Sequence, residues 1–420
     1  MRRPVFVGYI KLSYLKIFVK MRIAIDIRSL LEPCMSGIGE YSYNVLKRIL
    51  EADKENQFNL FYNIRHSVKT KPPKFDYPNV KTLGYQYPNR WLNLSLRYFG
   101  RPRLEKLSGD PDLMWFPNFG FMNFNIKVPY VLTVHDLSFE RYPEFFTPAH
   151  RLWHKLIDCR RMARGAAKII AVSENTKNDL IELYGISNDK IDVIYEGVGE
   201  EYFKETEKLS HSTNSGQENK EIKDDANMRK VVGKYDLPEE FILFLGTIEP
   251  RKNIEAIIRA FDKVCNTPQA PSLKLILAGG KGWNNEQIYD IYKQAKHRDK
   301  IKFIGYVDKE DKPALYSLAS LFVFPSIYEG FGLPPLEAMA CGTAVIASNA
   351  SSLPEVVEDA GLLVDPYNVN ELAEAMRVML GDDKLRQDFI EKGREQVKKF
   401  LWRSCADRTL EVINRVGGLF

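Results

Sequence analysis

The sequence predicts an α/β protein made of two doubly wound domains, each with a parallel sheet between layers of helices. Three observations support this fold class. Short β-branched and aromatic runs alternate with helix-length segments along nearly the whole chain, which is the pattern of repeated βαβ units. The alternation stops at one polar stretch and then restarts. The chain has 420 residues, which is long for a single hydrophobic core and fits two.

The expected strands of the first domain are separated by segments of helical length. RIAIDIR at residues 22–28 is a short β-branched run, as expected for a parallel strand buried on both faces. Gly37 and Gly39 are expected to form the turn after it, and an amphipathic helix follows. Further strands are expected at 58–64, 112–118, 130–136, 168–173 and 191–198, and further helices at 148–165 and 174–184.

The polar stretch, residues 204–228, is nearly free of apolar side chains and is predicted to be a flexible linker or surface insertion. The alternation then restarts in a second domain. Its strands are expected at 241–247, 273–279, 301–306, 321–326, 343–348 and 361–366, and its helices at 253–265, 284–297, 369–380 and 383–416.

These patterns give domain limits of 21–203 and 229–400. The final segment, 401–420, is a helix that can pack back on the first domain. Two doubly wound domains that face each other form a cleft, and ligands of such sheets bind outside the carboxyl ends of the strands.

The charge distribution separates the first twenty residues from the rest. They contain five bases and no acid, which equals the whole net charge of +5. The body is therefore neutral, which argues against a general nucleic-acid binder. Residues 1–20 are either a basic leader that touches a membrane or an extension upstream of a start at Met21. The complete strand that follows Met21 favours the extension.

No apolar run approaches the ~18 residues of a membrane span, and no secretory signal is recognisable. The five cysteines are scattered without a CxxC or Cys/His cluster, so neither a disulfide framework nor a zinc site is expected. A cytoplasmic protein is predicted, with peripheral contact to the inner face of the cell membrane as an option. Segments 97–107 and 151–164, which mix bases with large apolar residues, are either membrane-surface helices or ordinary amphipathic ones.

The stretch SIYEGFGLPPLEAMACGT, residues 326–343, places Glu329 on a glycine-rich loop and Glu337 inside a helix. Pro334 and Pro335 are expected to hold Leu333 extended and to start the helix. The helix N-terminus and the N–H groups of the loop favour an anion. From spacing alone, an anionic-ligand site and a structural turn with a capping glutamate remain equally open.

The stretch GTIEPRKN, residues 246–253, follows a strand and precedes a helix, so Arg251 and Lys252 are expected at the mouth of the cleft. An isolated basic pair is commonly a solvated turn. Together with the glycine-rich loop of the same domain, however, it favours binding of a pyrophosphate.

His135 and Asp136 end a strand of the first domain in TVHDLSFERYP. A catalytic or acceptor-side role and a structural role, with Asp136 as a cap, are both open for them. SGIGEYSYN at residues 36–44 lacks the third glycine of a dinucleotide loop because Ser42 stands there. A nicotinamide-dependent dehydrogenase is therefore disfavoured.

Taken in order, these stretches resemble glycosyltransferase family 4, whose GT-B fold has two Rossmann-like domains facing a central cleft. The resemblance runs from Met21 to about residue 400. It also includes AVSENTKNDLIELYG, KIDVIYEGV, FLGTIEPRKNIEAIIRAF, LILAGGKGW, IKFIGYV and SSLPEVVEDAGLLVDP. Glu329 and Glu337 match the family's pair of glutamates with seven residues between them. The sequence around His135 and Arg251 most resembles that of bacterial mannosyltransferases that act on polysaccharide or O-antigen precursors.

The resemblance implies transfer of a hexose from a nucleotide diphosphate sugar with retention of anomeric configuration, and mannose is the favoured hexose. GDP-mannose is the favoured donor and a UDP-sugar the alternative, and the acceptor is lipid-linked or a saccharide. No cofactor and no metal are expected. The non-hydrolysing sugar-nucleotide epimerases share the architecture and are a rival class, since an epimerase needs no acceptor. A non-catalytic nucleotide-sugar binder is another.

The resemblance also assigns roles to residues. Arg251 and Lys252 neutralise the leaving pyrophosphate, Glu329 faces the donor sugar, and His135 lies near the transferred sugar; these four are the expected catalytic residues. Glu337 holds the ribose hydroxyls, and Gly37 and Gly39 lie near the phosphates or the acceptor. The remaining expected substrate-binding residues are Asp136, Gly246, Gly330, Phe331, Gly332 and Leu333.

Overall fold

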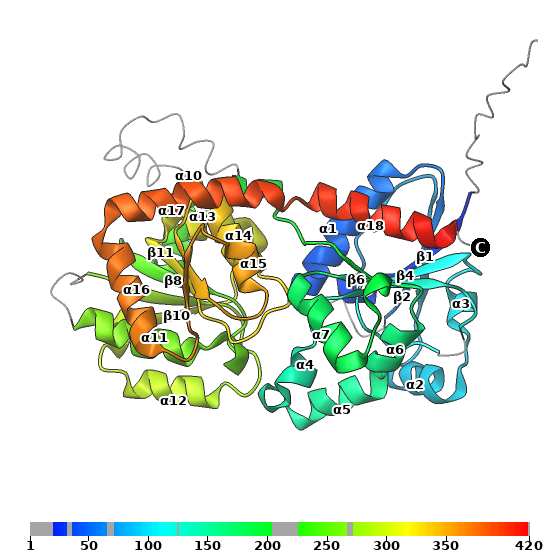
Figure 1. The fold of residues 1–420 in the computed structure, drawn as a ribbon, viewed down its shortest axis with the longest axis horizontal. Helices are drawn as coiled ribbons and strands as arrows, with labels where there is room; N and C mark the ends of the chain where they lie inside the picture. Colours follow the sequence, from blue (N-terminus) through cyan, green and yellow to red (C-terminus); the bar gives the residue numbers. More distant parts are fainter. Residues whose placement is uncertain are drawn as a thin grey trace, which may run out of the picture.

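The computed structural model describes residues 20–31, 36–64, 71–123, 126–203, 226–266 and 272–418. They form two lobes side by side, each built on a parallel sheet with helices around it (Figure 1). The α/β fold class with two doubly wound sheets is thus confirmed. The expectations for residues 1–19 and 204–225 lie outside the described residues.

The first sheet has seven strands in the order β3-β2-β1-β4-β5-β6-β7, and every neighbouring pair is parallel. Ile23 of β1 pairs with Phe58 on one side and with Leu113 on the other. The strands are β1 (Arg22–Asp26), β2 (Gln57–Asn63), β3 (Val80–Tyr85), β4 (Leu113–Phe116), β5 (Tyr130–Val134), β6 (Lys168–Ala171) and β7 (Ile191–Val193).

Two of these strands differ from the sequence-based expectation. No strand was expected at β3, which lies at the edge of the sheet and has no fully buried side chain, so no apolar run signals it. β7 ends at Val193, five residues before the predicted limit, because the chain leaves the sheet there.

The helices of the first lobe are α1 (Gly37–Ala52), α2 (Asn89–Leu94), α3 (Leu104–Leu107), α4 (Ser138–Arg141), α5 (Pro148–Ile157), α6 (Cys159–Gly165) and α7 (Glu174–Tyr184). Two expectations are wrong. Gly37 and Gly39 lie in the first turn of α1 rather than before it, and Ser36 caps the helix by accepting from the Gly39 N–H. The single helix expected at 148–165 is α5 and α6, broken at Asp158, whose φ is 61°.

The second sheet has six parallel strands in the order β10-β9-β8-β11-β12-β13. They are β8 (Phe241–Leu245), β9 (Lys274–Ala278), β10 (Ile301–Gly305), β11 (Leu321–Phe324), β12 (Val345–Ser348) and β13 (Leu362–Val364). The helices of the second half are α10 (Ala226–Tyr235), α11 (Ile254–Cys265), α12 (Glu286–Gln294), α13 (Lys312–Leu318), α14 (Leu333–Ala340), α15 (Leu353–Val357), α16 (Val369–Gly381), α17 (Asp383–Gln396) and α18 (Trp402–Gly417).

The first helix of the second half begins inside the stretch that the sequence predicts to be polar. α10 starts at Ala226, and Met228 is buried together with Val231 and Tyr235. Apolar residues at helical spacing therefore extend the packed structure three residues into that stretch.

The last helices differ from the single segment expected at 383–416. A 3₁₀ turn at Val397–Lys399 separates α17 from α18. At this break the Val198 N–H donates to the Phe400 carbonyl at 3.0 Å. α18 then runs across to the first lobe, where it packs on α1 and on β4, β5 and β6 (Figure 1, red).

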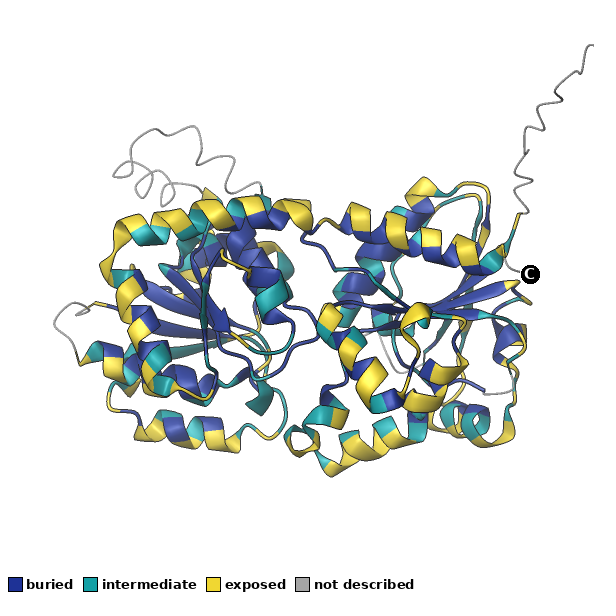
Figure 2. Ribbon diagram, viewed as in Figure 1, coloured by how far each residue is buried: buried dark blue, intermediate teal, exposed yellow. Residues whose placement is uncertain are grey.

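Both sheets are almost fully buried, whereas the outer faces of the helices are exposed (Figure 2). All residues of β4, β5 and β8, for example, are buried. Helices on both faces explain why these strands are continuous apolar runs instead of alternating patterns.

The strand order of each sheet reverses at one point. In the first sheet this topological switch point lies between β1 and β4, and in the second it lies between β8 and β11. Ligands of open α/β sheets bind at such points, outside the carboxyl ends of the strands. The segments that follow these four strands therefore determine what each lobe can bind.

Candidate active site

The basic pair follows β8, on one side of the second switch point. Pro250–Lys252 form a 3₁₀ turn, and Asn253, with a φ of 56°, starts α11. The Asn253 side-chain amide donates to the carbonyls of Pro325 at 3.1 Å and Pro366 at 2.7 Å. These bonds tie the turn to the segments after β11 and β13, so Arg251 and Lys252 are held against the glycine-rich loop.

The glycine-rich loop follows β11, on the other side of the switch point. Ser351 and Ser352 hold it: the Ser351 hydroxyl accepts from the Glu329 N–H at 2.8 Å, and the Ser352 hydroxyl donates to the Glu329 carbonyl at 3.0 Å. Gly332 ends the loop with a φ of 134°, which other residues rarely adopt.

Helix α14 begins at Leu333, so the expectation of an extended Leu333 is wrong. Pro334 and Pro335 occupy the second and third helical positions, where their missing N–H groups have no intrahelical partner to lose. The helix ends at Ala340, and Gly342 follows with a φ of 74°.

The two loops meet in a cluster of buried and half-buried charges. Lys252 Nζ lies 2.6 Å from Glu329 Oε1, and Arg251 Nη1 lies 3.0 Å from Glu329 Oε2. Arg251 Nη2 also lies 2.8 Å from Oε1 of Glu249, whose other oxygen has no hydrogen-bond partner within the described chain. The basic pair is therefore not a solvated turn but part of a network of two cations and two carboxylates.

The network shifts the pKa values of its members. Burial raises the pKa of Glu329, but Arg251 and Lys252 outweigh it, so this pKa lies below its ordinary value and the carboxylate is charged. Burial lowers the pKa of Lys252, and the adjacent Arg251 guanidinium adds to this effect. For Arg251 the two carboxylates outweigh burial and raise the pKa.

Glu337 has different partners from Glu329. Its two oxygens accept from the hydroxyls of Tyr202 at 2.9 Å and Tyr316 at 2.8 Å, and Lys312 Nζ lies 4.0 Å away. Burial and the Glu337 carboxylate raise the pKa values of both tyrosines, which therefore remain donors. The two glutamates of the motif thus sit in separate environments, one ionic and one phenolic.

His135 follows β5 and has a partner at each ring nitrogen. Nε2 lies 2.9 Å from the Pro117 carbonyl, and Nδ1 lies 2.9 Å from Glu196 Oε1. A carbonyl oxygen only accepts, so Nε2 carries a hydrogen. Tyr41 contacts the ring edge to face, with the ring centroids 4.7 Å apart, so the imidazole is held on three sides.

Asp136 caps a turn, while its predicted part in substrate binding stays a prediction. Its Oδ1 accepts from the Ser138 N–H at 3.0 Å and from the Ser138 hydroxyl at 2.7 Å. These bonds form the turn that begins α4.

The lobes meet at this point, and the structure brings predicted residues of both together. A Cβ at Gly330 would lie 2.1 Å from the His135 carbonyl oxygen, so only glycine permits the approach. The Thr176 hydroxyl donates to the same carbonyl at 3.0 Å. Gly37 faces Leu333 across the lobes.

Other bonds between the lobes surround this contact. The Glu355 carboxylate accepts from the N–H groups of Glu174 and Asn175 at the start of α7. Farther along, the Trp283 indole donates to the Phe145 carbonyl at 2.8 Å.

Two predicted residues take part in the packing and the strand ladder of the second lobe. The Phe331 side chain is buried against Tyr195 and Phe400. The Gly246 N–H donates to the Ala278 carbonyl at 3.0 Å, continuing the ladder beyond β8.

Sequence reasoning missed several residues of the site. Glu249 stands in the quoted GTIEPRKN stretch, which marked it as a candidate, whereas Glu196 lay inside the strand predicted at 191–198 and follows the observed strand, which ends at Val193. Tyr202 and Tyr316 carried no signal, because nothing local connects them to Glu337.

Among the residues described, no group of three or more His, Cys, Asp or Glu is arranged to hold a metal ion. None of the helices in the described ranges is long and apolar enough to span a bilayer.

Comparisons with known proteins agree with the geometry. The model of the family "Glycosyltransferase Family 4" matches residues 61–202, and that of "Glycosyl transferases group 1" matches residues 225–396. The chain belongs to glycosyltransferase family 4. The predicted resemblance and the enzyme class are thereby confirmed.

Two curated relatives carry mannosyltransferase names. O-antigen chain mannosyltransferase B of Escherichia coli is 29% identical over 90% of this chain and 95% of its own length. The serotype-specific mannosyltransferase WbdA of Escherichia coli is 34% identical over 70% of this chain, which spans about a third of that protein.

A solved structure confirms the GT-B fold. Sucrose-phosphate synthase of Thermosynechococcus elongatus superposes with a TM-score of 0.72 at 21% identity, covering 96% of this chain and all of that one.

Proposed function

We propose that this glycosyltransferase transfers mannose from GDP-mannose to a lipid-linked or saccharide acceptor in the synthesis of a cell-surface polysaccharide. The observation that carries the proposal is the buried network of Arg251, Lys252 and Glu329 at the second switch point. A family 4 enzyme uses a nucleotide-sugar donor and an acceptor, and this network has the charges that a donor pyrophosphate requires.

The chemistry follows from these charges. The bond between the anomeric carbon and the pyrophosphate oxygen breaks, a bond forms from that carbon to an acceptor hydroxyl oxygen, and the hydroxyl proton passes to the departing pyrophosphate, on which negative charge grows. Arg251 and Lys252 exchange part of their contact with Glu329 and Glu249 for phosphate oxygens. Preorganised charges in a buried site stabilise such a leaving group without reorganisation of solvent.

The carboxylates released from these contacts have a second task. Glu329, on the loop next to His135, accepts hydrogen bonds from hydroxyls of the donor sugar. His135, whose Nδ1 lies 2.9 Å from Glu196 Oε1, faces the same sugar. Glu337 holds the ribose hydroxyls in place of the phenols of Tyr202 and Tyr316.

The mannose assignment is supported by the names of the relatives, both mannosyltransferases. The family does not favour the epimerase alternative, because an epimerase transfers nothing to an acceptor.

The test is a transfer assay with GDP-mannose, UDP-glucose and UDP-N-acetylglucosamine against polyprenyl-diphosphate-linked and free oligosaccharides. We expect a product from GDP-mannose that contains one additional α-linked mannose. Conversion of the donor without an acceptor into an epimer would contradict the proposal, and transfer from a UDP-sugar alone would overturn the donor assignment.

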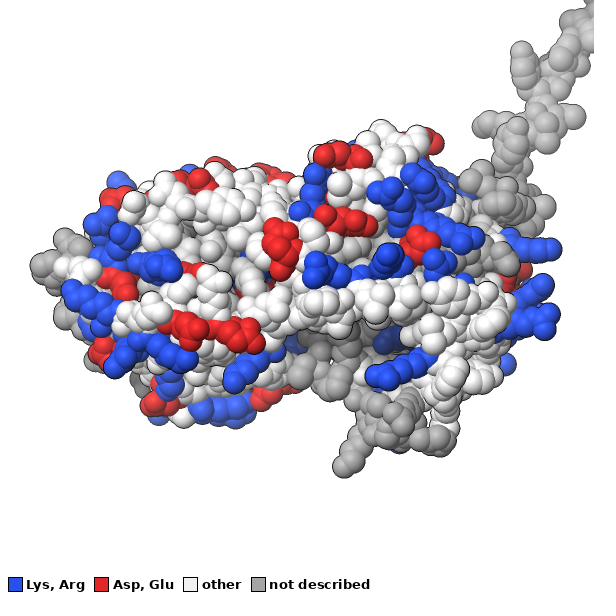
Figure 3. Space-filling model, turned by 90° about the horizontal axis from the view of Figure 1, so that it is seen from below, with Lys and Arg blue, Asp and Glu red and all other residues white. Residues whose placement is uncertain are grey.

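A membrane-facing surface on the first lobe is a further part of the proposal. Exposed Trp91, Leu94, Tyr98 and Phe99 lie on α2 and the π-helical turn after it, and exposed Leu152 lies on α5. The same and the adjoining segments carry exposed bases, namely Arg90, Arg101, Arg103, Arg151, Lys155, Arg160 and Arg164. Seen from below, basic side chains gather over this lobe with fewer acids between them (Figure 3). Large apolar residues among bases suit the headgroup region of an anionic bilayer, and would bring the enzyme to a lipid-linked acceptor on the inner face of the cell membrane.

A further inference from the structure

A cavity of about 460 Å³ lies at the switch point of the first sheet. Its wall includes Asp26 at the end of β1, Arg28 just after it, and Pro117, Asn118 and Phe119 after β4. This volume falls in the range of roughly 300–1,000 Å³ that is typical of small-molecule sites. The cavity occupies the same topological position in the first sheet as the ionic network does in the second.

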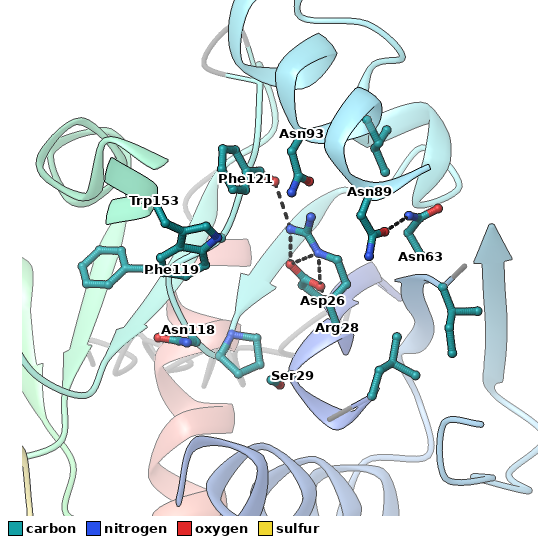
Figure 4. A pocket seen from close by; sticks show the side chains of 15 residues that line it. Asp26, Arg28, Ser29, Asn63, Asn89, Asn93, Asn118, Phe119, Phe121 and Trp153 are labelled. Atoms are coloured by element: carbon teal, nitrogen blue, oxygen red, sulfur yellow. Dashed lines mark hydrogen bonds and ion pairs between the residues drawn. The ribbon is translucent and has the colours of Figure 1, made fainter. Parts of the chain in front are cut away.

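The polar groups of the cavity are mainly amides. Asn63 is used structurally, since it bonds to the backbone of Tyr87 and to the Asn89 side chain. Within the described residues, the amides of Asn93 and Asn118 have no hydrogen-bond partner in the cavity wall (Figure 4). Each amide offers donors and an acceptor, which together match hydroxyl groups that both donate and accept.

The described lining carries one cation and one anion, and they neutralise each other. Arg28 Nε and Nη2 bond to both oxygens of Asp26, and Nη2 also donates to the Phe121 carbonyl at 2.9 Å. Figure 4 shows the guanidinium with Asp26 on one side and the amides of Asn93 and Asn89 on the other. With most of its donors used, Arg28 serves better as a fixed donor to a neutral ligand than as a phosphate anchor.

One wall of the cavity is aromatic. Phe119, Phe121 and Trp153 line it, and the rings of Phe121 and Trp153 meet edge to face with centroids 6.2 Å apart. Trp153 is 43% exposed, so its ring is available to a ligand. A sugar ring has apolar C–H faces and a rim of hydroxyls, and this combination of aromatic faces with amides suits both.

The cavity adjoins the candidate active site. Pro117 lines the cavity, and its carbonyl also accepts from His135 Nε2. Asn93 of α2 and Trp153 of α5 also line the cavity, and these two helices carry the proposed membrane-facing surface. A ligand held here would therefore contact both those helices and the segment that bonds to His135.

We propose that this cavity binds a neutral sugar unit of the acceptor, and that Asn93, Asn118 and Trp153 select for it. The inference rests on the proposed function, because an acceptor site has meaning only for a transferase. It adds that the enzyme recognises a saccharide, so a lipid diphosphate without a sugar is not a sufficient acceptor.

The test measures binding separately from transfer. Isothermal titration in the presence of GDP measures the binding of three probes of the cavity, which are α-mannotriose, maltotriose and inorganic pyrophosphate. We expect at least one oligosaccharide to bind. The variants Asn93→Ala, Asn118→Ala and Trp153→Phe should each bind that oligosaccharide about 5- to 10-fold more weakly than the wild-type protein does, the effect of one lost hydrogen bond or ring contact. Their affinity for GDP should stay unchanged. Asn370→Ala and Tyr367→Ala, at exposed positions of the second lobe, are matched controls that should change nothing.

Three results would overturn the inference. They are binding of no oligosaccharide to the wild-type protein, unchanged oligosaccharide affinity in all three variants, and loss of pyrophosphate rather than oligosaccharide binding in those variants. Thermal midpoints identify a variant that fails to fold, and Trp153→Tyr then replaces Trp153→Phe. Failure of GDP binding in the wild-type protein would instead contradict the proposed function, so the two failures are distinguishable.

Discussion

The two switch points of this protein occupy equivalent places in two similar sheets, yet their chemistry differs. At β8 and β11 the loops bring two cations and two carboxylates into contact. At β1 and β4 they leave a cavity lined by amides and aromatic rings around one neutralised ion pair. Parallel-sheet topology determines where a ligand binds, whereas the side chains of the loops determine which ligand it is.

The contrast also concerns the backbone. The second site is backed by an eight-residue helix, α14, that begins in the loop itself, and helix N-termini favour anions. In the first lobe the segment after β1 that lines the cavity is the short turn Arg28–Leu31, and α1 begins farther along at Gly37, which is not among the cavity-lining residues. Under the two proposals above, the charged leaving group and the neutral acceptor are held at the ends of different sheets.

The largest expected effect concerns Glu329 and Glu337, which have ionic and phenolic partners respectively. Glu329→Gln should lower kcat on the order of 100-fold with little change in the donor KM, because it removes a charge placed beside the breaking bond. Glu337→Gln should mainly raise the donor KM. Steady-state kinetics with the donor varied at saturating acceptor measure both. Identical behaviour of the two variants would refute the division of roles.

The second expected effect is on binding of the nucleotide. Lys252→Met should lower the affinity for GDP by roughly 10- to 150-fold, since a charge-assisted hydrogen bond contributes ~1.5–3 kcal/mol. Lys293→Met, at an exposed lysine of α12, is the matched control. Isothermal titration with GDP decides the matter, and an affinity equal to that of the control would make the ionic network purely structural.

A smaller effect is expected on the pH dependence of stability, through a histidine of the first lobe. Burial lowers the pKa of His154, next to the cavity residue Trp153, from its ordinary 6.5 to about 4. Between these values the unfolded chain binds a proton that the folded protein does not, so stability falls as the pH drops through this window. Each pKa unit corresponds to ~1.4 kcal/mol, and we expect a loss of roughly 1–3 kcal/mol.

His154→Phe should remove this loss while keeping the ring that stacks on Phe139. The pKa of Glu329 lies below its ordinary 4.5, so its contribution is present above that value and is lost only at more acidic pH. Urea unfolding between pH 7 and 4 measures the slope, and an unchanged slope in the variant would exclude His154 as its source.

The smallest effect on stability is expected at the surface of the first lobe. Trp91→Ala should change the free energy of unfolding by less than about 0.5 kcal/mol, because Trp91 is 73% exposed. It should nevertheless reduce co-sedimentation with vesicles that contain phosphatidylglycerol. Tyr367→Ala, on the second lobe and 69% exposed, serves as the control. Equal binding of both variants would argue against the membrane-facing surface.

The sequence by itself determined the elements whose signal is local. Strands buried on both faces, such as β5 and β8, are continuous apolar runs, and their order along the chain is sufficient to predict two doubly wound sheets. The loops with Arg251, Lys252 and Glu329 were predictable because glycines, prolines and charges mark the ends of such strands. The limits 21–203 and 229–400 stay a prediction, as do the individual roles of the site residues.

Only the tertiary structure decided how these loops are used. It paired Glu329 with both cations, gave Glu337 two tyrosines, and joined His135 to Glu196. It also broke the last helix, so that α18 covers the first sheet. The physical reason is range: periodicity and turn chemistry act over a few residues, whereas Tyr202 and Glu337 are 135 positions apart. Contacts of that kind arise when two lobes pack against each other, and no local pattern encodes them.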